Sequence, residues 1–200
     1  MRHQMTNLKK WRFDFRLWHW IHAVVVLGLL GTVFLRKTFL SWRTNSELLT
    51  QKLSEINLEV TADQAKVLAK AIRAPMWEWH IALGYALAAL LLWRIVLFFT
   101  ESGKTNYKNI KEETLYKKMV KLGYLGIYTI LVFMAITGLT IHFHEALGLA
   151  KDTAGNIKDV HELVFNAILI FVPLHIIGVV VAEIKDEQGI ISAMIHGGSK

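Results

Sequence analysis

The chain has 200 residues, of which 54% are hydrophobic, with a formal net charge of +7 and a mean hydropathy of +0.36. This composition is too apolar for a soluble domain of the same size and indicates a membrane protein. The chain has no cysteine, which excludes disulfides, thiolate metal sites and iron–sulfur clusters. The positive charge lies beside the apolar stretches rather than on a soluble face, so it does not indicate a nucleic-acid partner.

Four apolar stretches are each about the 20 residues long that crossing a bilayer core requires. They cover residues 17–35, 77–100, 122–141 and 163–182. The first is too long for the apolar part of a cleavable signal peptide and has no small-residue cleavage pattern after it. The sequence therefore predicts an all-α integral membrane protein, in which residues 1–200 form one domain built as a four-helix transmembrane bundle.

The distribution of lysine and arginine predicts the orientation of the spans. The first 16 residues hold five of these cations and residues 101–121 hold six, whereas residues 145–162 hold two against four acids. By the positive-inside rule, the first two segments are cytoplasmic. Arg36, Lys37 and Arg43 oppose this assignment, because they follow the first span on the predicted outer side. An even number of spans still places both termini together, and we expect both in the cytoplasm.

Residues 36–76 form a polar excursion between the first and second spans. Apolar residues at helical spacing predict two short helical pieces in it, one around Leu48 and one around Leu68. The second piece opens on Thr61-Ala-Asp-Gln64, which fits a capping box, and Pro75 is expected to end it. We interpret the excursion as an amphipathic hairpin on the outer membrane surface. A docking platform for a soluble partner is the alternative.

Nine histidines occur, and five lie at or within predicted spans, where an ionisable group is costly and indicates function. His161 and His175 are fourteen residues apart in the fourth span, so they leave one helix face at depths about 21 Å apart. His80 begins the second span at the outer depth of His161, and His19 begins the first at the inner depth of His175. Paired imidazoles at two depths predict two bis-histidine b-type haems, since two axial imidazoles favour electron transfer over oxygen binding.

The other histidines are assigned less directly. His22 follows His19 by nearly one helical turn, so spacing alone leaves either as the inner ligand. His142 and His144 end the third span, and we interpret them as interfacial residues, with a quinone or partner contact as the alternative. The histidines of the terminal polar segments are interpreted as surface residues: His3 and His196.

A haem pocket also needs small neighbours and cations for the propionates. Gly84 stands one turn after His80, and other glycines leave further room in the spans: Gly28, Gly31, Gly138 and Gly178. Arg94 lies fourteen residues after His80, at the inner depth, and Arg16 precedes His19 by three, so both are candidate propionate partners. Ordinary helix packing for the glycines and snorkelling for the arginines are the alternatives.

With these residues in place, the chain resembles the prokaryotic cytochrome b561 superfamily and, within it, the b-type cytochrome subunit of membrane-bound nickel–iron hydrogenases. The matching segments are Arg16-Leu-Trp-His19-Trp20, His80-Ile-Ala-Leu-Gly84 with Arg94, Thr137-Gly138, His161 with His175, and Glu183 followed by Gly189-Ile-Ile-Ser-Ala-Met-Ile-His-Gly197. The resemblance favours His19 over His22 as the inner ligand. The excursion at 36–76 and the short loop at 101–121 differ from the hydrogenase subunit, so the partner enzyme stays open.

The residues and the resemblance together predict a dihaem electron carrier of the bacterial cytoplasmic membrane. Its expected cofactors are two haems b, with a bound quinone as a further candidate. Its expected partners are membrane lipid, quinone, and a periplasmic redox protein or dehydrogenase subunit, with a homodimer also considered. The alternatives are a self-contained quinone-linked oxidoreductase, such as a superoxide oxidase, and a metal transporter. The last is disfavoured because the span centres hold no carboxylate.

Overall fold

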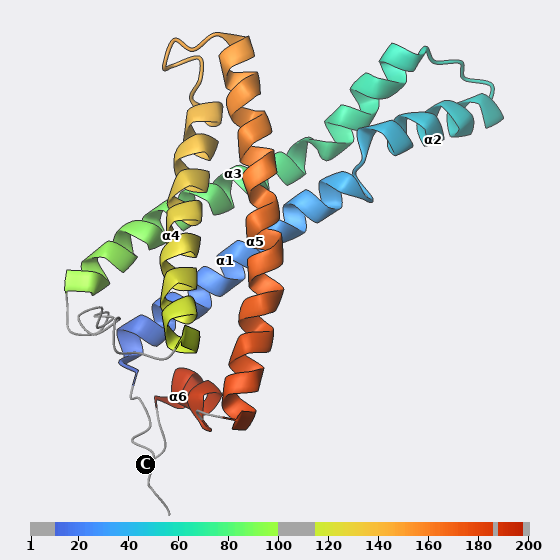
Figure 1. Cartoon of the computed structure of the whole chain (residues 1–200). Coiled ribbons are helices and arrows are strands. Elements are labelled where there is room, and N and C mark those ends of the chain that lie inside the picture. Colours follow the sequence, from blue (N-terminus) through green and yellow to red (C-terminus); the bar gives the residue numbers. More distant parts are fainter. Residues whose placement is uncertain (1–10, 100–114, 186–187, 198–200) are drawn as a thin grey trace, which may run out of the picture. The chain divides into compact units, whose positions relative to one another are not determined.

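The computed structural model describes residues 11–99, 115–185 and 188–197, and all regular structure within these ranges is helical (Figure 1). The helices are α1 (Phe13–Lys37), α2 (Trp42–Glu55), α3 (Ala62–Phe99), α4 (Leu115–His142), α5 (Lys151–Lys185) and α6 (Ile190–His196). Four of them, α1, α3, α4 and α5, are long and apolar enough to cross a membrane. The predicted fold class, an all-α membrane protein with four spans, is confirmed.

The four span helices extend beyond the predicted spans. Each predicted span lies inside one of these helices, except that the second ends at residue 100, outside the described residues. Helix α5 begins at Lys151 rather than at residue 163. His161 therefore lies well inside a helix instead of at its beginning. The predicted orientation rests in part on cations at 1–10 and 101–114, which also lie outside the described residues.

The excursion consists of α2 and the first part of α3. The predicted capping box is present, because the Thr61 amide donates to Gln64 Oε1 at 2.8 Å and the Gln64 amide donates to Thr61 Oγ1 at 3.3 Å. The prediction that Pro75 ends this helix is wrong, since α3 runs through Pro75 to Phe99 as one element. Proline removes one backbone donor and leaves one carbonyl without its helical partner, a loss that a long helix tolerates where neighbouring groups or water satisfy that carbonyl.

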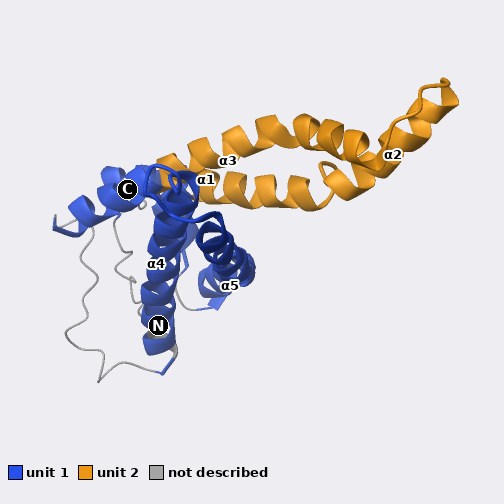
Figure 2. Ribbon diagram, turned by 90° about the horizontal axis from the view of Figure 1, so that it is seen from above, with its two compact units in different colours: residues 1–22, 88–200 blue, residues 23–87 orange. Residues whose placement is uncertain are grey.

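The chain forms two compact units, residues 1–22 with 88–200 and residues 23–87 (Figure 2). In the second unit, α1 and α3 run side by side and approach closely at Gly28. A Cβ atom added at Gly28 would lie 3.0 Å from Leu83 Cδ1, so the Leu83 side chain would have to shift to accommodate a larger residue. This glycine therefore serves helix packing, which is the use of small residues expected in membranes.

In the first unit, α4 packs along α5, and α6 is held by residues from two other helices. The Glu183 carboxylate of α5 accepts hydrogen bonds from the amides of Gly189 and Ile191, each at 2.9 Å. Arg16 and Trp20 of α1 donate to the carbonyls at the far end of α6: Ile195 O at 2.6 Å and Met194 O at 3.3 Å. These contacts anchor the segment Glu183 to Gly197, which the sequence comparison had singled out.

Large apolar side chains are exposed on all four span helices. Examples are Val24, Leu92, Leu122 and Leu163, each more than 60% exposed. Exposed apolar surface of this extent on a membrane-spanning helix faces lipid. The protein is therefore a multi-pass membrane protein in contact with lipid.

Candidate haem-binding site

The first unit brings together His19 of α1 and His175 of α5, the predicted inner ligands. Their ring centroids are 6.3 Å apart, and the ring planes are inclined by 59°. A metal held by one nitrogen of each imidazole, with bonds of about 2 Å, places the two centroids about 6 Å apart. Rotation of either ring about its bond to the metal leaves that separation unchanged. The two rings are thus spaced as two axial ligands of one iron would be.

Aromatic side chains surround this pair. The Phe171 ring lies 5.8 Å from that of His175 in a nearly parallel arrangement, and the Tyr124 ring meets His175 edge-on at 6.2 Å. Trp20 lies edge-on to His19 at 5.4 Å. Flat apolar walls of this kind suit a flat apolar cofactor, because they offer ring faces and edges instead of unpaired polar groups.

His22, the other candidate for the inner ligand, contacts a different residue. The His22 ring stacks on the Trp18 ring, with the ring centroids 4.8 Å apart and the planes inclined by 21°. Its Nε2 atom is buried and has no hydrogen-bond partner among the described residues. Of the two candidates that the spacing left open, His19 is therefore the one that faces His175.

Arg94 of α3 lies among aromatic rings. Its guanidinium carbon is 5.5 Å from the ring centroids of Phe15 and Trp18 and 5.3 Å from that of Tyr128. Its Nε atom donates to the Tyr128 hydroxyl at 3.1 Å. Cation–π contacts and this hydrogen bond hold the guanidinium among aromatic rings. Arg16, the other candidate propionate partner, donates to Ile195 O.

His161 of α5 lies against α4 at the Thr137-Gly138 pair. Thr137 Oγ1 is 2.8 Å from His161 Nδ1. A Cβ atom added at Gly138 would lie 3.4 Å from His161 Cε1, so the imidazole lies close to α4 at this glycine. Thr137 had no predicted role, and Gly138 was predicted to leave room for haem; in the structure both residues lie against His161.

His80 of α3 belongs to the second unit, where it meets α1. Its Nδ1 atom is 2.7 Å from Thr32 Oγ1, and Trp77 lies edge-on to its ring at 5.5 Å. Sequence reasoning missed Thr32. The available signal was a hydroxyl residue inside an apolar span, which in membranes often bonds across helices.

The glycines predicted to leave room fall into two groups. Gly28 and Gly138 make the close contacts described above, so both serve packing. At Gly31, Gly84 and Gly178 an added Cβ would meet nothing within 4 Å. Gly84 lies one turn from His80 and Gly178 nearly one turn from His175, so each leaves open space near a candidate ligand.

The remaining histidines lie at helix ends. His142 ends α4 and lies edge-on to Phe143, with the ring centroids 4.8 Å apart. His144 Nδ1 is 3.0 Å from the Ile141 carbonyl, and His196 ends α6. His3 lies outside the described residues.

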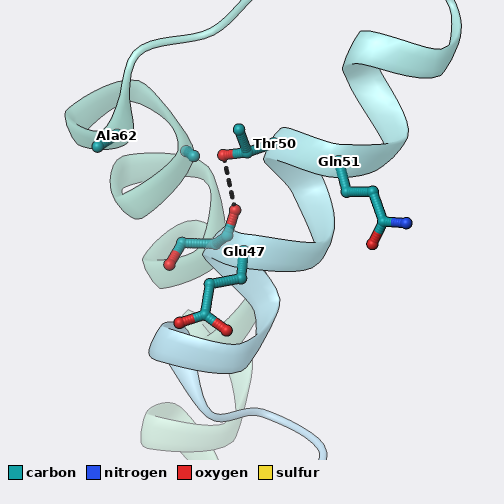
Figure 3. Close-up of a pocket in the computed structure, with 6 residues that line it drawn as sticks. Glu47, Thr50, Gln51 and Ala62 are labelled. Carbon is teal, nitrogen blue, oxygen red and sulfur yellow. Dashed lines mark hydrogen bonds between the residues drawn. The ribbon is translucent and has the colours of Figure 1, made fainter.

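A pocket in the excursion between α2 and α3 offers a different surface (Figure 3). Ser46, Glu47, Thr50, Gln51, Ala62 and Ala65 line it. Thr50 Oγ1 donates to the Ser46 carbonyl at 3.0 Å, so that hydroxyl is already satisfied by its own helix. The lining holds no histidine or aromatic residue, and the pocket does not suit haem.

The number of protein ligands distinguishes a haem site from the site of a single metal ion. In the described parts of the chain, no three His, Asp or Glu side chains gather into a group that would hold a metal ion. Two protein ligands alone are too few for a structural or catalytic ion of the zinc type. A haem macrocycle supplies the four further nitrogens that an iron with two axial imidazoles needs.

Trp18 provides a test of the packing beneath the site. It is 2% exposed, and its Nε1 atom donates to the Leu90 carbonyl at 2.7 Å. We expect Trp18→Ala to lower the free energy of unfolding in mixed micelles by about 3 kcal/mol, because it leaves a cavity among packed rings. Trp79→Ala is the control, since Trp79 is 68% exposed. Equal losses for the two variants would show that Trp18 is not a packing centre.

Four lipid-facing helices and a facing pair of histidines lined by aromatic residues are typical of membrane haem proteins. The family model described as prokaryotic cytochrome b561 matches residues 10–197. The chain therefore belongs to the prokaryotic cytochrome b561 family. It is a membrane b-type cytochrome that binds haem b and takes part in transmembrane electron transfer. No curated protein and no solved structure matches it.

Proposed function

We propose that the protein holds two haems b and carries electrons across the bacterial cytoplasmic membrane, between a periplasmic redox partner and the quinone pool. The observation that carries this proposal is the His19–His175 pair, whose 6.3 Å centroid separation fits two axial ligands of one iron. His80 lies on α3 and His161 on α5, at matching predicted depths. They form the second ligand pair.

The two sites differ in depth within the membrane. His19 and His175 ligate the inner haem, and His80 and His161 ligate the outer haem, because the fourteen residues between His161 and His175 correspond to about 21 Å along one helix. When bound, haem b supplies the one-electron redox change. The chain supplies the axial imidazoles, the apolar walls and the local charges.

The charged and small residues have supporting roles in this proposal. Arg94, which lies among the rings of Phe15, Trp18 and Tyr128, balances a propionate of the inner haem. Arg16 holds α6 and lies three residues before His19, from where it serves the same haem. Gly84 leaves room beside His80 for the plane of the outer haem. Both termini lie in the cytoplasm, in accordance with the positive-inside rule, and the excursion lies on the outer membrane surface.

The test is a reduced-minus-oxidised spectrum of the purified chain together with a haem-to-protein ratio. We expect b-type bands, a ratio of two and two low-spin ferric EPR signals, since each iron has two axial imidazoles. A ratio of one would refute the dihaem proposal, and high-spin signals would refute bis-histidine ligation.

A second measurement separates a carrier from a self-contained oxidoreductase. A carrier subunit is expected to show little turnover with quinone and a small reductant such as superoxide in the absence of its partner protein. Rapid quinone reduction by the purified chain with superoxide alone would instead favour the complete enzyme.

A further inference from the structure

Helix α6 is held at both of its ends by side chains from the two helices that carry the predicted inner ligands. At its beginning, the Glu183 carboxylate of α5 accepts hydrogen bonds from the amides of Gly189 and Ile191, each at 2.9 Å. At its end, Arg16 and Trp20 of α1 donate to carbonyls of α6 at 2.6 and 3.3 Å. All of these residues belong to the first unit. Within that unit, α6 therefore connects α5 to α1.

The partners at the two ends of α6 carry the charges that the ends of a helix favour. A helix leaves its first amides and its last carbonyls without partners of its own. The amide end carries a partial positive charge and the carbonyl end a partial negative charge. The anion Glu183 binds the first end, and the cation Arg16 binds the second. Hydrogen bonds with one charged partner are roughly twice as strong as neutral ones, so this connection is stronger than neutral side chains would make it.

Gly197 leaves room for Arg16 at the end of α6. Its φ of 91° lies in the left-handed region, which residues with a Cβ atom rarely adopt. A Cβ atom added at this glycine would lie 3.2 Å from Arg16 Cζ. Alanine at this position would therefore strain the backbone and crowd the guanidinium group where it binds the last carbonyls.

The contacts with α6 lie on both sides of His19 in the sequence of α1. Arg16 precedes His19 by three residues and Trp20 follows it, and the Trp20 ring lies edge-on to the His19 ring at 5.4 Å between centroids. At about 100° per residue, His19 lies about 60° around the helix from Arg16, whereas His22 lies about 120° from it. The face of α1 that α6 holds is thus nearer to His19 than to His22.

On α5, the same connection begins near His175. Glu183 follows His175 by eight residues, which corresponds to about 12 Å along the helix. The two helices therefore meet in two ways, through α6 and through the facing rings of His19 and His175, 6.3 Å apart. Because the rotation of α1 about its axis decides where the His19 ring points, loss of the first connection should disturb the second.

We propose that Glu183, Arg16 and Trp20 are positioning residues that act through α6 to hold His19 opposite His175 at the inner haem. The inference rests on the proposed function, in which these two histidines ligate that haem. The connection through α6 fixes the rotation of α1 that presents His19 to α5.

The test starts from Glu183, because its carboxylate binds the amides of α6. We expect Glu183→Ala to reduce the protection of residues 189–197 against hydrogen exchange and to shift the EPR signal of the haem that His175→Ala removes. In detergent, that haem should transfer to excess apomyoglobin about tenfold faster, the effect of one lost hydrogen bond to a charged group. The other haem should keep its signal and transfer rate. Glu183→Gln retains one acceptor oxygen and should give smaller changes of the same kind.

A second variant and two matched controls complete the design. Gly197→Ala should shift the same EPR signal from the other end of α6, because it crowds Arg16. Gly148→Ala is its control, since Gly148 also has a positive φ, of 67°, but an added Cβ there would meet nothing within 4 Å. Glu145→Ala is the control for Glu183, because it removes a carboxylate whose side chain is 84% exposed. Both controls should leave both haems unchanged.

The outcomes separate this inference from the function on which it rests. A wild-type chain without two low-spin haems would refute the dihaem function. With both haems present in the wild type, retained protection of residues 189–197 in Glu183→Ala would overturn the positioning role. Lost protection with both haems unchanged would overturn it too, as would equal changes in both haems, which indicate a general loss of packing. If Glu183→Ala does not fold, Glu183→Gln and Gly197→Ala decide by the same criteria.

Discussion

His175→Ala is expected to lower the haem-to-protein ratio from two to one. The remaining imidazole, that of His19, would leave the iron with an open sixth position and a weakened hold on the cofactor. The substitution also removes a ring that packs against Phe171 and Tyr124, so haem would lose part of its apolar wall. The measurement is the haem-to-protein ratio of the purified variant, with the EPR spectrum to show which low-spin signal is lost.

The first span supplies a matched comparison for this prediction. His19→Ala should lose the same haem signal as His175→Ala, because the two rings face each other at 6.3 Å. His22→Ala should keep both haems, since its ring stacks on Trp18, and His142→Ala at the end of α4 should also keep both. Retention of two haems in His19→Ala together with loss of one in His22→Ala would refute the assignment of the inner ligand.

Sequence reasoning located the spans because hydropathy and length report the bilayer directly. It also located the capping box, because that motif is local in the chain and its two hydrogen bonds join Thr61 and Gln64, three residues apart. Both successes concern features set by neighbours in sequence. The position of Pro75 inside α3 shows the limit, since whether a proline ends a helix depends on what surrounds the freed carbonyl.

Contacts between helices were the part that the pattern could not supply. Spacing left His19 and His22 both open because they lie nearly one turn apart. The resemblance favoured His19, and the position of α5 shows that His19 faces His175. The hydroxyl of Thr32 in an apolar span indicates a contact across helices, but the sequence does not identify His80, 48 residues away, as its partner. The surroundings of Arg94 likewise required the placement of Phe15 and Tyr128, which come from different helices. The spacing of these residues predicts their depth in the membrane, but only the packed structure shows which residues they contact.

The pairing of His80 with His161 rests on their matching depth alone. If the two histidines ligate one iron, their variants should lose the same haem, whereas histidines that ligate separate irons should lose different haems. If both ligate one iron, His80→Ala and His161→Ala should each lower the haem-to-protein ratio from two to one. The double variant should also retain one haem, because the second substitution removes a ligand from a site that is already empty.

The identity of the haem that remains makes the comparison decisive. All three variants should keep the EPR signal and the midpoint potential of the haem that His175→Ala loses. If the two histidines ligate separate irons, the two single variants should lose different EPR signals. The double variant should then lose both signals. Loss of one common signal would place the two histidines on one haem. Because His161 and His175 then ligate different irons from one helix, the relay would extend along α5 over the depth that their fourteen-residue spacing covers.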